Sequence, residues 1–191
     1  MKILVISGKS ASGKDTIAQM MREKLEANGK KCITIHYADL VKFFAKEFYN
    51  WDGNKDVAGR RLLQTLGTNK VRANDADYWV ECVARFLAAI SPSGDFDCAF
   101  IPDARFPNEI EVLKKYNDNV ITIRINRIRT EDNLPYYNPA LTIEQIKHPS
   151  ETSLDHWNEF DYIVENRSLE ELKESAEVIL SDIGLFDEVM V

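Results

Sequence analysis

The residues with the clearest chemical meaning lie between Gly8 and Thr16. They read Gly-Lys-Ser-Ala-Ser-Gly-Lys-Asp-Thr, which is a glycine, four residues, a second glycine and a lysine. An apolar run precedes this segment and a helical pattern follows it, and that is the context in which such a loop cradles phosphate. Backbone N–H groups, the helix N-terminus and Lys14 would then surround the β- and γ-phosphates. The segment predicts an ATP site formed by Gly8, Ser10, Ser12, Gly13, Lys14, Asp15 and Thr16.

Position 15 departs from the usual form of this motif. A serine or threonine normally follows the lysine and contacts Mg²⁺ through its hydroxyl, whereas this chain has Asp15. A carboxylate so close to phosphates needs a compensating cation or N–H group. Two roles stay open, since Asp15 could hold magnesium, directly or through water, or could orient a cationic neighbour. The plain alternative is a favourable negative charge at a helix N-terminus.

A second charged group follows the apolar run from Cys98 to Pro102. Asp103 ends that run, Arg105 is two residues further on, and Glu109 can face back toward the same place from the next helix. Open α/β sheets bind ligands at the carboxyl ends of their strands. We therefore expect Asp103 to help hold magnesium, and Arg105 and Glu109 to serve the substrate or the reaction. A turn exposed on the surface is the alternative.

Further candidates for an acceptor site lie between residues 60 and 79. Arg60 and Arg61 are adjacent, and adjacent side chains on a helix diverge by about 100°, so only one of them would face a ligand fully. Gly67-Thr68 is expected to end that helix and to offer an N–H or hydroxyl group. Trp79 has two equal interpretations, core packing and stacking on a base. Alternatively, the arginines belong to a solvated helix face.

Strands and helices alternate along the whole chain. Short apolar runs predict strands at 2–7, 32–36, 98–102, 120–125 and 162–164, and stripes at helical spacing lie between and after them. This pattern predicts an α/β fold in three layers, with a central parallel sheet flanked by helices, in one domain spanning 1–191. The polar segment 126–153 is the expected lid, with Arg127 and Arg129 as the candidates that close over the phosphoryl group.

Composition excludes several other classes of protein. The chain has 191 residues and a net charge of −7, and no basic run suggests that it binds a nucleic acid polymer. Its three cysteines form no close pair and its histidines lack metal-ligand spacing, so we expect neither a disulfide framework nor a zinc site, and no role for His36. No apolar stretch is long enough to cross a membrane, which favours a cytoplasmic protein. The sequence leaves a homodimer open.

These motifs, together with His148-Pro149-Ser150-Glu151, resemble the phage-type deoxynucleoside monophosphate kinases. The resemblance runs from the first strand to the polar segment. It implies the P-loop kinase fold and Mg²⁺-dependent transfer of the ATP γ-phosphoryl group to a deoxynucleoside 5′-monophosphate, in the host cytoplasm if the gene is a phage's. It also implies catalytic roles for Lys14, Asp15, Arg61, Asp103, Arg105 and Glu109. The acceptor would contact Arg60, Arg61, Gly67, Thr68, Trp79, Asp103, Arg105 and Glu109.

Two rival functions stay open. The ending Ser12-Gly13-Lys14-Asp15 is also similar to that of phosphomevalonate kinases, which are P-loop kinases with another small acceptor. The second rival is a nucleotide-dependent switch ATPase. A switch has no obvious need for the second group of cations, which favours a kinase whose acceptor already carries a phosphate.

Overall fold

Five parallel strands form one sheet in the order β2-β3-β1-β4-β5 in a computed structural model of the chain. The structure describes residues 1–186, so the last five residues of the predicted domain lie outside it. The strands are β1 (Lys2–Gly8), β2 (Cys32–Thr34), β3 (Cys98–Ala104), β4 (Val120–Arg127) and β5 (Tyr162–Asn166). Because every strand runs in the same direction, all the carboxyl ends meet at one edge, where ligands bind in sheets of this type.

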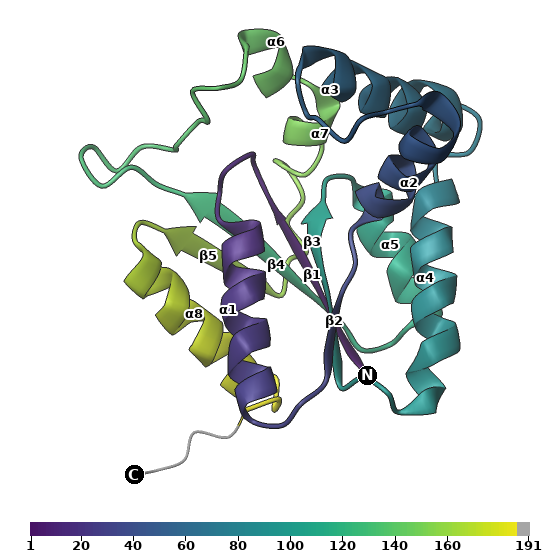
Figure 1. Cartoon of the computed structure of the whole chain (residues 1–191). Helices are drawn as coiled ribbons and strands as arrows, with labels where there is room; N and C mark the ends of the chain where they lie inside the picture. The colour runs from purple at the N-terminus through teal and green to yellow at the C-terminus, as the bar shows by residue number, and fades with distance from the viewer. Residues whose placement is uncertain (187–191) are drawn as a thin grey trace.

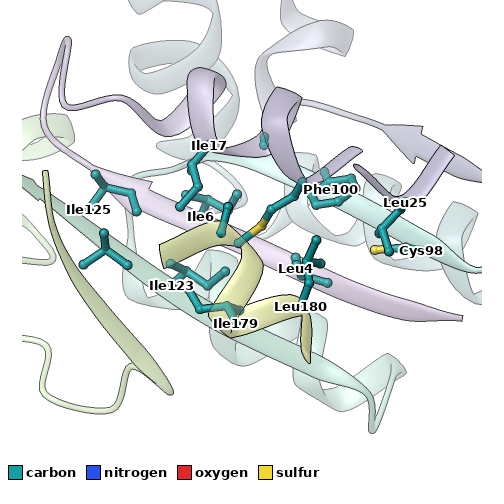
Figure 2. Packing of buried hydrophobic residues seen from close by; sticks show 14 of the residues in the cluster. Leu4, Ile6, Ile17, Leu25, Cys98, Phe100, Ile123, Ile125, Ile179 and Leu180 are labelled. Carbon is teal, nitrogen blue, oxygen red and sulfur yellow. The ribbon is translucent and has the colours of Figure 1, made fainter. Parts of the chain in front are cut away.

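Helices cover both faces of the sheet (Figure 1). On one face lie α1 (Lys14–Ala27) and α8 (Leu169–Asp182), and on the other α4 (Tyr78–Ile90) and α5 (Pro107–Tyr116). Strand β1 shows why both faces are apolar, since Leu4 and Ile6 pack toward α1 while Ile3 and Val5 pack toward α4 and α5. Figure 2 shows the first of these cores, in which Ile17 and Leu25 of α1 meet the sheet. The predicted three-layer α/β architecture is confirmed.

A side layer of helices extends from the second face. It contains α2 (Tyr37–Tyr49), α3 (Val57–Gln64) and a π-helix, η1 (Thr65–Arg72). Val41, Ala45, Leu66 and Trp79 join α2, η1 and α4 in a separate small core. This layer stands beside the carboxyl end of β3, where it forms one wall of a pocket described below.

The expected helix end at Gly67-Thr68 is wrong. The helix continues to Arg72 with wider turns, as the hydrogen bond from the Ala73 N–H to the Thr68 carbonyl shows. A π-helix leaves its carbonyls in unusual directions, and the indole N–H of Trp79 donates to the Gly67 oxygen at 3.1 Å. That side-chain partner lies twelve residues away in sequence, so helical spacing could not reveal it.

The connection from β4 to β5 is also more ordered than its composition indicated. Two helices of one turn each, α6 (Ile143–Ile146) and α7 (Pro149–Thr152), interrupt it. The Thr142 hydroxyl accepts the Gln145 N–H at the start of α6, and the His148 side chain accepts the Ser150 N–H at the start of α7. Elsewhere in the chain, a 3-10 turn, η2 (Ser91–Ser93), follows α4 and precedes β3.

Candidate active site

The loop between β1 and α1 has the shape that its glycines predict. Gly8 and Gly13 have φ angles of 153° and 105°, which side-chain-bearing residues rarely adopt. A Cβ at Gly8 would lie 2.4 Å from the Ser12 Oγ, and a Cβ at Gly13 would lie 2.6 Å from the Asn166 Nδ2. Asn166 also donates to the Ser12 carbonyl at 2.8 Å, so the end of β5 holds the loop from one side. Both glycines are therefore required by conformation and by space.

Lys14 is folded back into this loop. Its side chain is 5% exposed and its Nζ donates to the Lys9 carbonyl at 2.7 Å. Burial, helped by the positive charge of Arg105, lowers the pKa of Lys14 to about 7. A buried ammonium with no phosphate beside it is costly, and an anion bound in the loop would restore its charge.

Asp15 projects outward from the first turn of α1. Its carboxylate lies 3.5 Å from the Nε2 of His36, which follows β2, and 79% of its side chain is exposed. The hydrogen bond between the two groups lowers the pKa of Asp15 and raises that of His36. His36, for which the sequence indicated no role, also faces Asp39 through Nδ1 at 3.2 Å. Asp15 is thus a solvent-facing carboxylate whose imidazole neighbour favours its ionised form.

Asp103 lies at the N-terminus of α2. Its two carboxylate oxygens accept the backbone N–H groups of Tyr37 at 2.9 Å and Ala38 at 3.1 Å, and burial raises its pKa. A negative charge at this end of a helix is stabilising. Asp103 therefore fixes the side layer to the end of β3, and both of its oxygens already have partners.

Arg105 and Glu109 are neighbours at the end of β3. One oxygen of Glu109 accepts the N–H groups of Arg105 and Phe106, and the other accepts Arg72 at 2.8 Å. Burial raises the pKa of Glu109 to about 7, while these donors oppose the shift. Glu109 holds the backbone that carries Arg105. Arg72 is 37 residues away from this carboxylate in the sequence, so local spacing does not indicate the pair.

These residues border a cavity of about 220 Å³, here called the α2-side pocket. Its apolar wall comes from α2, α3, η1, α4 and Phe106, and its polar groups include Arg72, Arg105 and Lys42. Gly67 and Thr68, both predicted to contact the acceptor, line this cavity. Trp79 also lines it, yet the side chain is 4% exposed and sits mainly in the small core. Arg60 and Arg61 are exposed and outside the lining, and Arg60 instead donates to the Lys55 carbonyl at 2.9 Å.

A second cavity, the α1-side pocket, borders the loop and the first turn of α1. It has a volume of about 350 Å³, and its lining includes Gly13, Asp15, Thr16, Arg127, Asn166 and Arg167. Arg127 donates to the Ala11 carbonyl at 3.1 Å and stacks on the Tyr136 ring at 4.2 Å. Arg129 turns away and pairs with Asp132. Of the two lid candidates, only Arg127 therefore reaches the loop.

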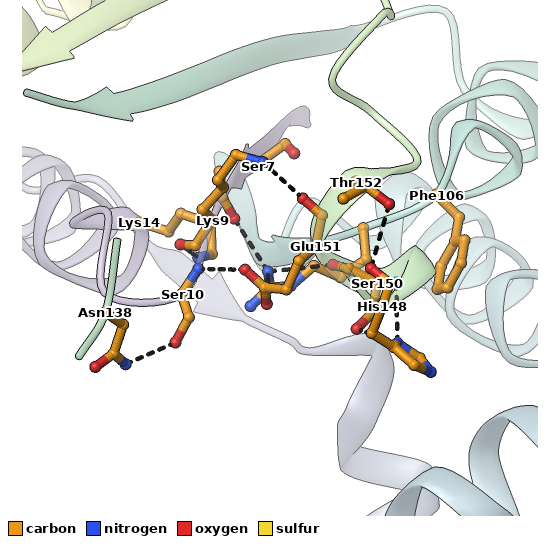
Figure 3. A network of polar contacts seen from close by, with 12 residues as sticks. Ser7, Lys9, Ser10, Lys14, Phe106, Asn138, His148, Ser150, Glu151 and Thr152 are labelled. Carbon is orange, nitrogen blue, oxygen red and sulfur yellow. Dashed lines mark hydrogen bonds and ion pairs between the residues drawn. The ribbon is translucent and has the colours of Figure 1, made fainter. Parts of the chain in front are cut away.

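Side chains of the connection between β4 and β5 also contact the phosphate loop (Figure 3). Asn138 donates to the Ser10 hydroxyl at 3.0 Å, and the Glu151 carboxylate accepts the Ser10 N–H at 2.7 Å. Asp155 pairs with Lys9 at 2.6 Å and with Arg124 at 2.9 Å. Asn138, Glu151 and Asp155 were not singled out as site residues, although Glu151 belongs to the motif that carried part of the family resemblance.

A family model described as deoxynucleotide monophosphate kinase matches residues 23–176 of the 191. The chain belongs to this family. The match begins after the phosphate loop, so it is independent of the motif at Gly8–Thr16. A comparison with curated proteins gives no match. Membership of the deoxynucleotide monophosphate kinase family makes the chain a nucleotide kinase, which is an ATP-dependent phosphotransferase.

Solved structures similar to this kinase have low sequence identity and show the fold. A sugar kinase from Janibacter sp. HTCC2649 is 18% identical, with a TM-score of 0.53 over 97% of this chain and 96% of its own. A gluconokinase from Sinorhizobium meliloti 1021 is 14% identical, with a TM-score of 0.51 over 95% and 93%. An APS kinase from Mycobacterium tuberculosis, solved with AMPPNP and APS, is 14% identical, with a TM-score of 0.47 over 95% and 96%. The sugar kinase and the gluconokinase, together with the parallel sheet and the glycine-rich loop, confirm the predicted P-loop kinase fold.

The donor groups of this kinase fit magnesium only in part. Among residues 1–186, no three His, Cys, Asp or Glu side chains converge on one point, and both oxygens of Asp103 accept backbone amides. Mg²⁺ is usually held by one or two carboxylates together with substrate phosphates, and the exposed Asp15 fits that arrangement.

Among residues 1–186, no helix has the length and hydrophobicity to span a membrane.

Proposed function

We propose that this kinase transfers the γ-phosphoryl group of ATP to a deoxynucleoside 5′-monophosphate, giving ADP and a deoxynucleoside diphosphate. The observation that carries the proposal is that both pockets adjoin one phosphate loop: Gly13 of the loop lines the α1-side pocket, and Arg105, which lines the α2-side pocket, donates to the Gly8 carbonyl at 3.2 Å. Such an arrangement suits two anionic ligands that meet end to end. The family of the chain supports a nucleotide as the acceptor.

The α2-side pocket suits the acceptor better than the α1-side pocket does. Its wall is largely apolar, with Val41, Phe106 and the edge of Trp79 available to a base, and Arg105 lies at the end nearest the loop. Ligand pockets of this kind combine an apolar wall with a few polar groups that fix orientation. In the α1-side pocket, Arg127 and Arg167 flank Gly13 and Thr16, which suits the donor nucleotide.

The chemistry needs little beyond position and charge. The acceptor phosphate is already an anion near neutral pH, so no strong general base is required. Lys14 would neutralise the charge that spreads over the transferring group, and Arg105 would hold the acceptor phosphate in line with it. Asp15 would hold Mg²⁺, which neutralises charge on the β- and γ-phosphates when bound. Asp103 and Glu109 would keep the backbones around Tyr37 and Arg105 in place.

Coupled measurement of ADP release tests the proposal. Each deoxynucleoside monophosphate is supplied in turn with ATP and Mg²⁺, and phosphomevalonate serves as the comparison acceptor. Turnover with one or more deoxynucleotides, reduced at least about a hundredfold in Lys14→Ala, is the expected result. Turnover with phosphomevalonate alone would keep the fold and refute the acceptor. Slow hydrolysis of ATP that no acceptor stimulates would point to a switch ATPase instead.

A further inference from the structure

Glu151 joins the two halves of the site through its carboxylate. One oxygen accepts the backbone N–H of Ser10 in the phosphate loop at 2.7 Å, and the other accepts the Nη1 of Arg105 at 2.7 Å. The side chain is only 12% exposed, so this bridge is shielded from water. Short, charge-assisted hydrogen bonds of this kind are roughly twice as strong as neutral ones. Figure 3 shows Glu151 between Ser10 and the helix turn that carries His148 and Ser150.

The same side chain faces neither ligand pocket. Within the described part of the chain, Glu151 is missing from the lining of both the α2-side and the α1-side pocket, whereas Arg105 and its neighbour Ser150 line the former. Glu151 therefore stands behind Arg105 as seen from the acceptor. A carboxylate in that place does not block a phosphate from the pocket, and it does not touch the ligand.

Arg105 keeps part of its guanidinium available because of this arrangement. Its Nη1 donates to Glu151, to the Gly8 carbonyl and to the Ser150 carbonyl, while Nε and Nη2 have no hydrogen-bond partner among residues 1–186. Because the guanidinium is planar and rigid, fixing its Nη1 also fixes the direction in which Nε and Nη2 can donate. Holding the fork in advance removes the entropy cost of ordering it when the acceptor phosphate binds.

We propose that Glu151 is a positioning residue that sets the distance and angle between the phosphate loop and the acceptor-binding face of Arg105. The inference rests on the proposed function, and it adds a residue to which no role in the reaction was assigned above. Ser10, although predicted as part of the ATP site, lines neither pocket and has its N–H paired with Glu151, so the effect of Glu151 is on alignment of the acceptor and not on binding of ATP.

The test compares Glu151→Gln with the wild-type chain in the same coupled assay, with ATP affinity measured separately by calorimetry. Glutamine keeps the shape of the side chain but turns an amide NH₂ toward either Arg105 or the Ser10 N–H, both of which are donors. We expect kcat/KM for the acceptor to fall about 10- to 100-fold, because small misplacements cost that much, while the Kd for ATP changes less than about threefold. Glu144→Gln, on the exposed helix α6 of the same connection, is the matched control and should leave both values unchanged.

A double-mutant cycle then asks whether Glu151 acts through Arg105. In an Arg105→Ala background, Glu151→Gln should lower kcat/KM less than about threefold further, because the group that it positions is already gone. An equally large loss in both backgrounds would refute the proposal. Tighter ATP binding or faster turnover in Glu151→Gln would also overturn it and would mark the carboxylate as a competitor of phosphate.

Further outcomes distinguish a variant that does not fold, a failure of the proposed function and a failure of the positioning role alone. If Glu151→Gln does not fold, Glu151→Asp decides, because it keeps the charge but is one methylene too short to bridge both partners, and wild-type kinetics in that variant would sink the idea. If the wild-type chain phosphorylates no deoxynucleotide, the proposed function fails. If it does so and Glu151→Gln is unaffected, only the positioning role fails.

Discussion

ATP binding to this kinase should weaken steeply above neutral pH because of Lys14. In the free protein, burial holds the pKa of this amine at about 7, against an ordinary value of 10.5. The phosphates of a bound nucleotide favour the charged form, so the complex carries a proton that the free protein loses as pH rises past 7. Affinity must then fall with increasing pH, from about 7 up to the higher pKa of the complex.

The size of the effect follows from the position of Lys14. One proton is taken up with ATP at any pH between the Lys14 pKa of about 7 in the free protein and its higher pKa in the complex, so each pH unit above 7 costs about 1.4 kcal/mol of binding free energy. That corresponds to a rise in Kd of about tenfold at pH 8 and about a hundredfold at pH 9. Close to one proton should be taken up for each ATP bound at pH 8.5.

Calorimetry with Mg²⁺ and ATP between pH 6.5 and 9, in buffers of different ionisation enthalpy, measures both quantities. Lys14→Arg is the control, because a guanidinium stays charged throughout this range and its affinity should not depend on pH in the same way. A wild-type Kd that is constant from pH 7 to 9, with no proton uptake, would show that the buried amine is already charged and would refute the reasoning.

Three further substitutions test other parts of the site. Arg105→Ala should raise the KM for the acceptor at least about tenfold with little change in the Kd for ATP, and an increase in the ATP requirement alone would contradict its acceptor role. Arg72→Ala leaves Glu109 buried without its cation, so urea unfolding at pH 8 should show a loss of about 1–2 kcal/mol, because a carboxyl with a pKa of about 7 can take up a proton in place of the lost partner. The loss should shrink toward pH 5, because a carboxyl whose folded pKa is raised loses stability as pH rises; a small, pH-independent loss would count against the pairing. Trp79→Phe should cost about 1 kcal/mol of stability through the lost bond to Gly67, and unchanged stability with impaired acceptor binding would instead support stacking on a base.

Local patterns predicted the parts of this protein that depend on local chemistry. The glycines at 8 and 13 and the lysine at 14 predicted a loop whose conformation requires them, and apolar runs located the strands. The order of the strands could not be predicted, because it depends on which runs pair across the sheet. The direction of Arg60 was equally hidden, since a carbonyl five residues away holds its side chain.

Long-range partners account for most of what the sequence did not reveal about the site. Glu151 lies 141 residues from Ser10, and Asn166 lies 154 residues from Ser12. Neither has a spacing that local periodicity can detect. His36 is similar, because its role depends on β2 ending beside the first turn of α1. A carboxylate inside an otherwise unexplained motif, as at Glu151, was the one available signal.

The π-helix at Thr65–Arg72 gives this kinase an unusual evolutionary freedom. A π-helix behaves as an α-helix that has gained a residue, so losing or gaining one residue there exchanges one hydrogen-bond pattern for another. Each such step turns the following side chains by about 100° around the helix axis while the sheet and the phosphate loop stay in place. Gly67, Thr68 and Arg72, all in the α2-side pocket, lie on this segment. Changes in chain length, and not only changes in residue type, could therefore alter which acceptors relatives of this protein take.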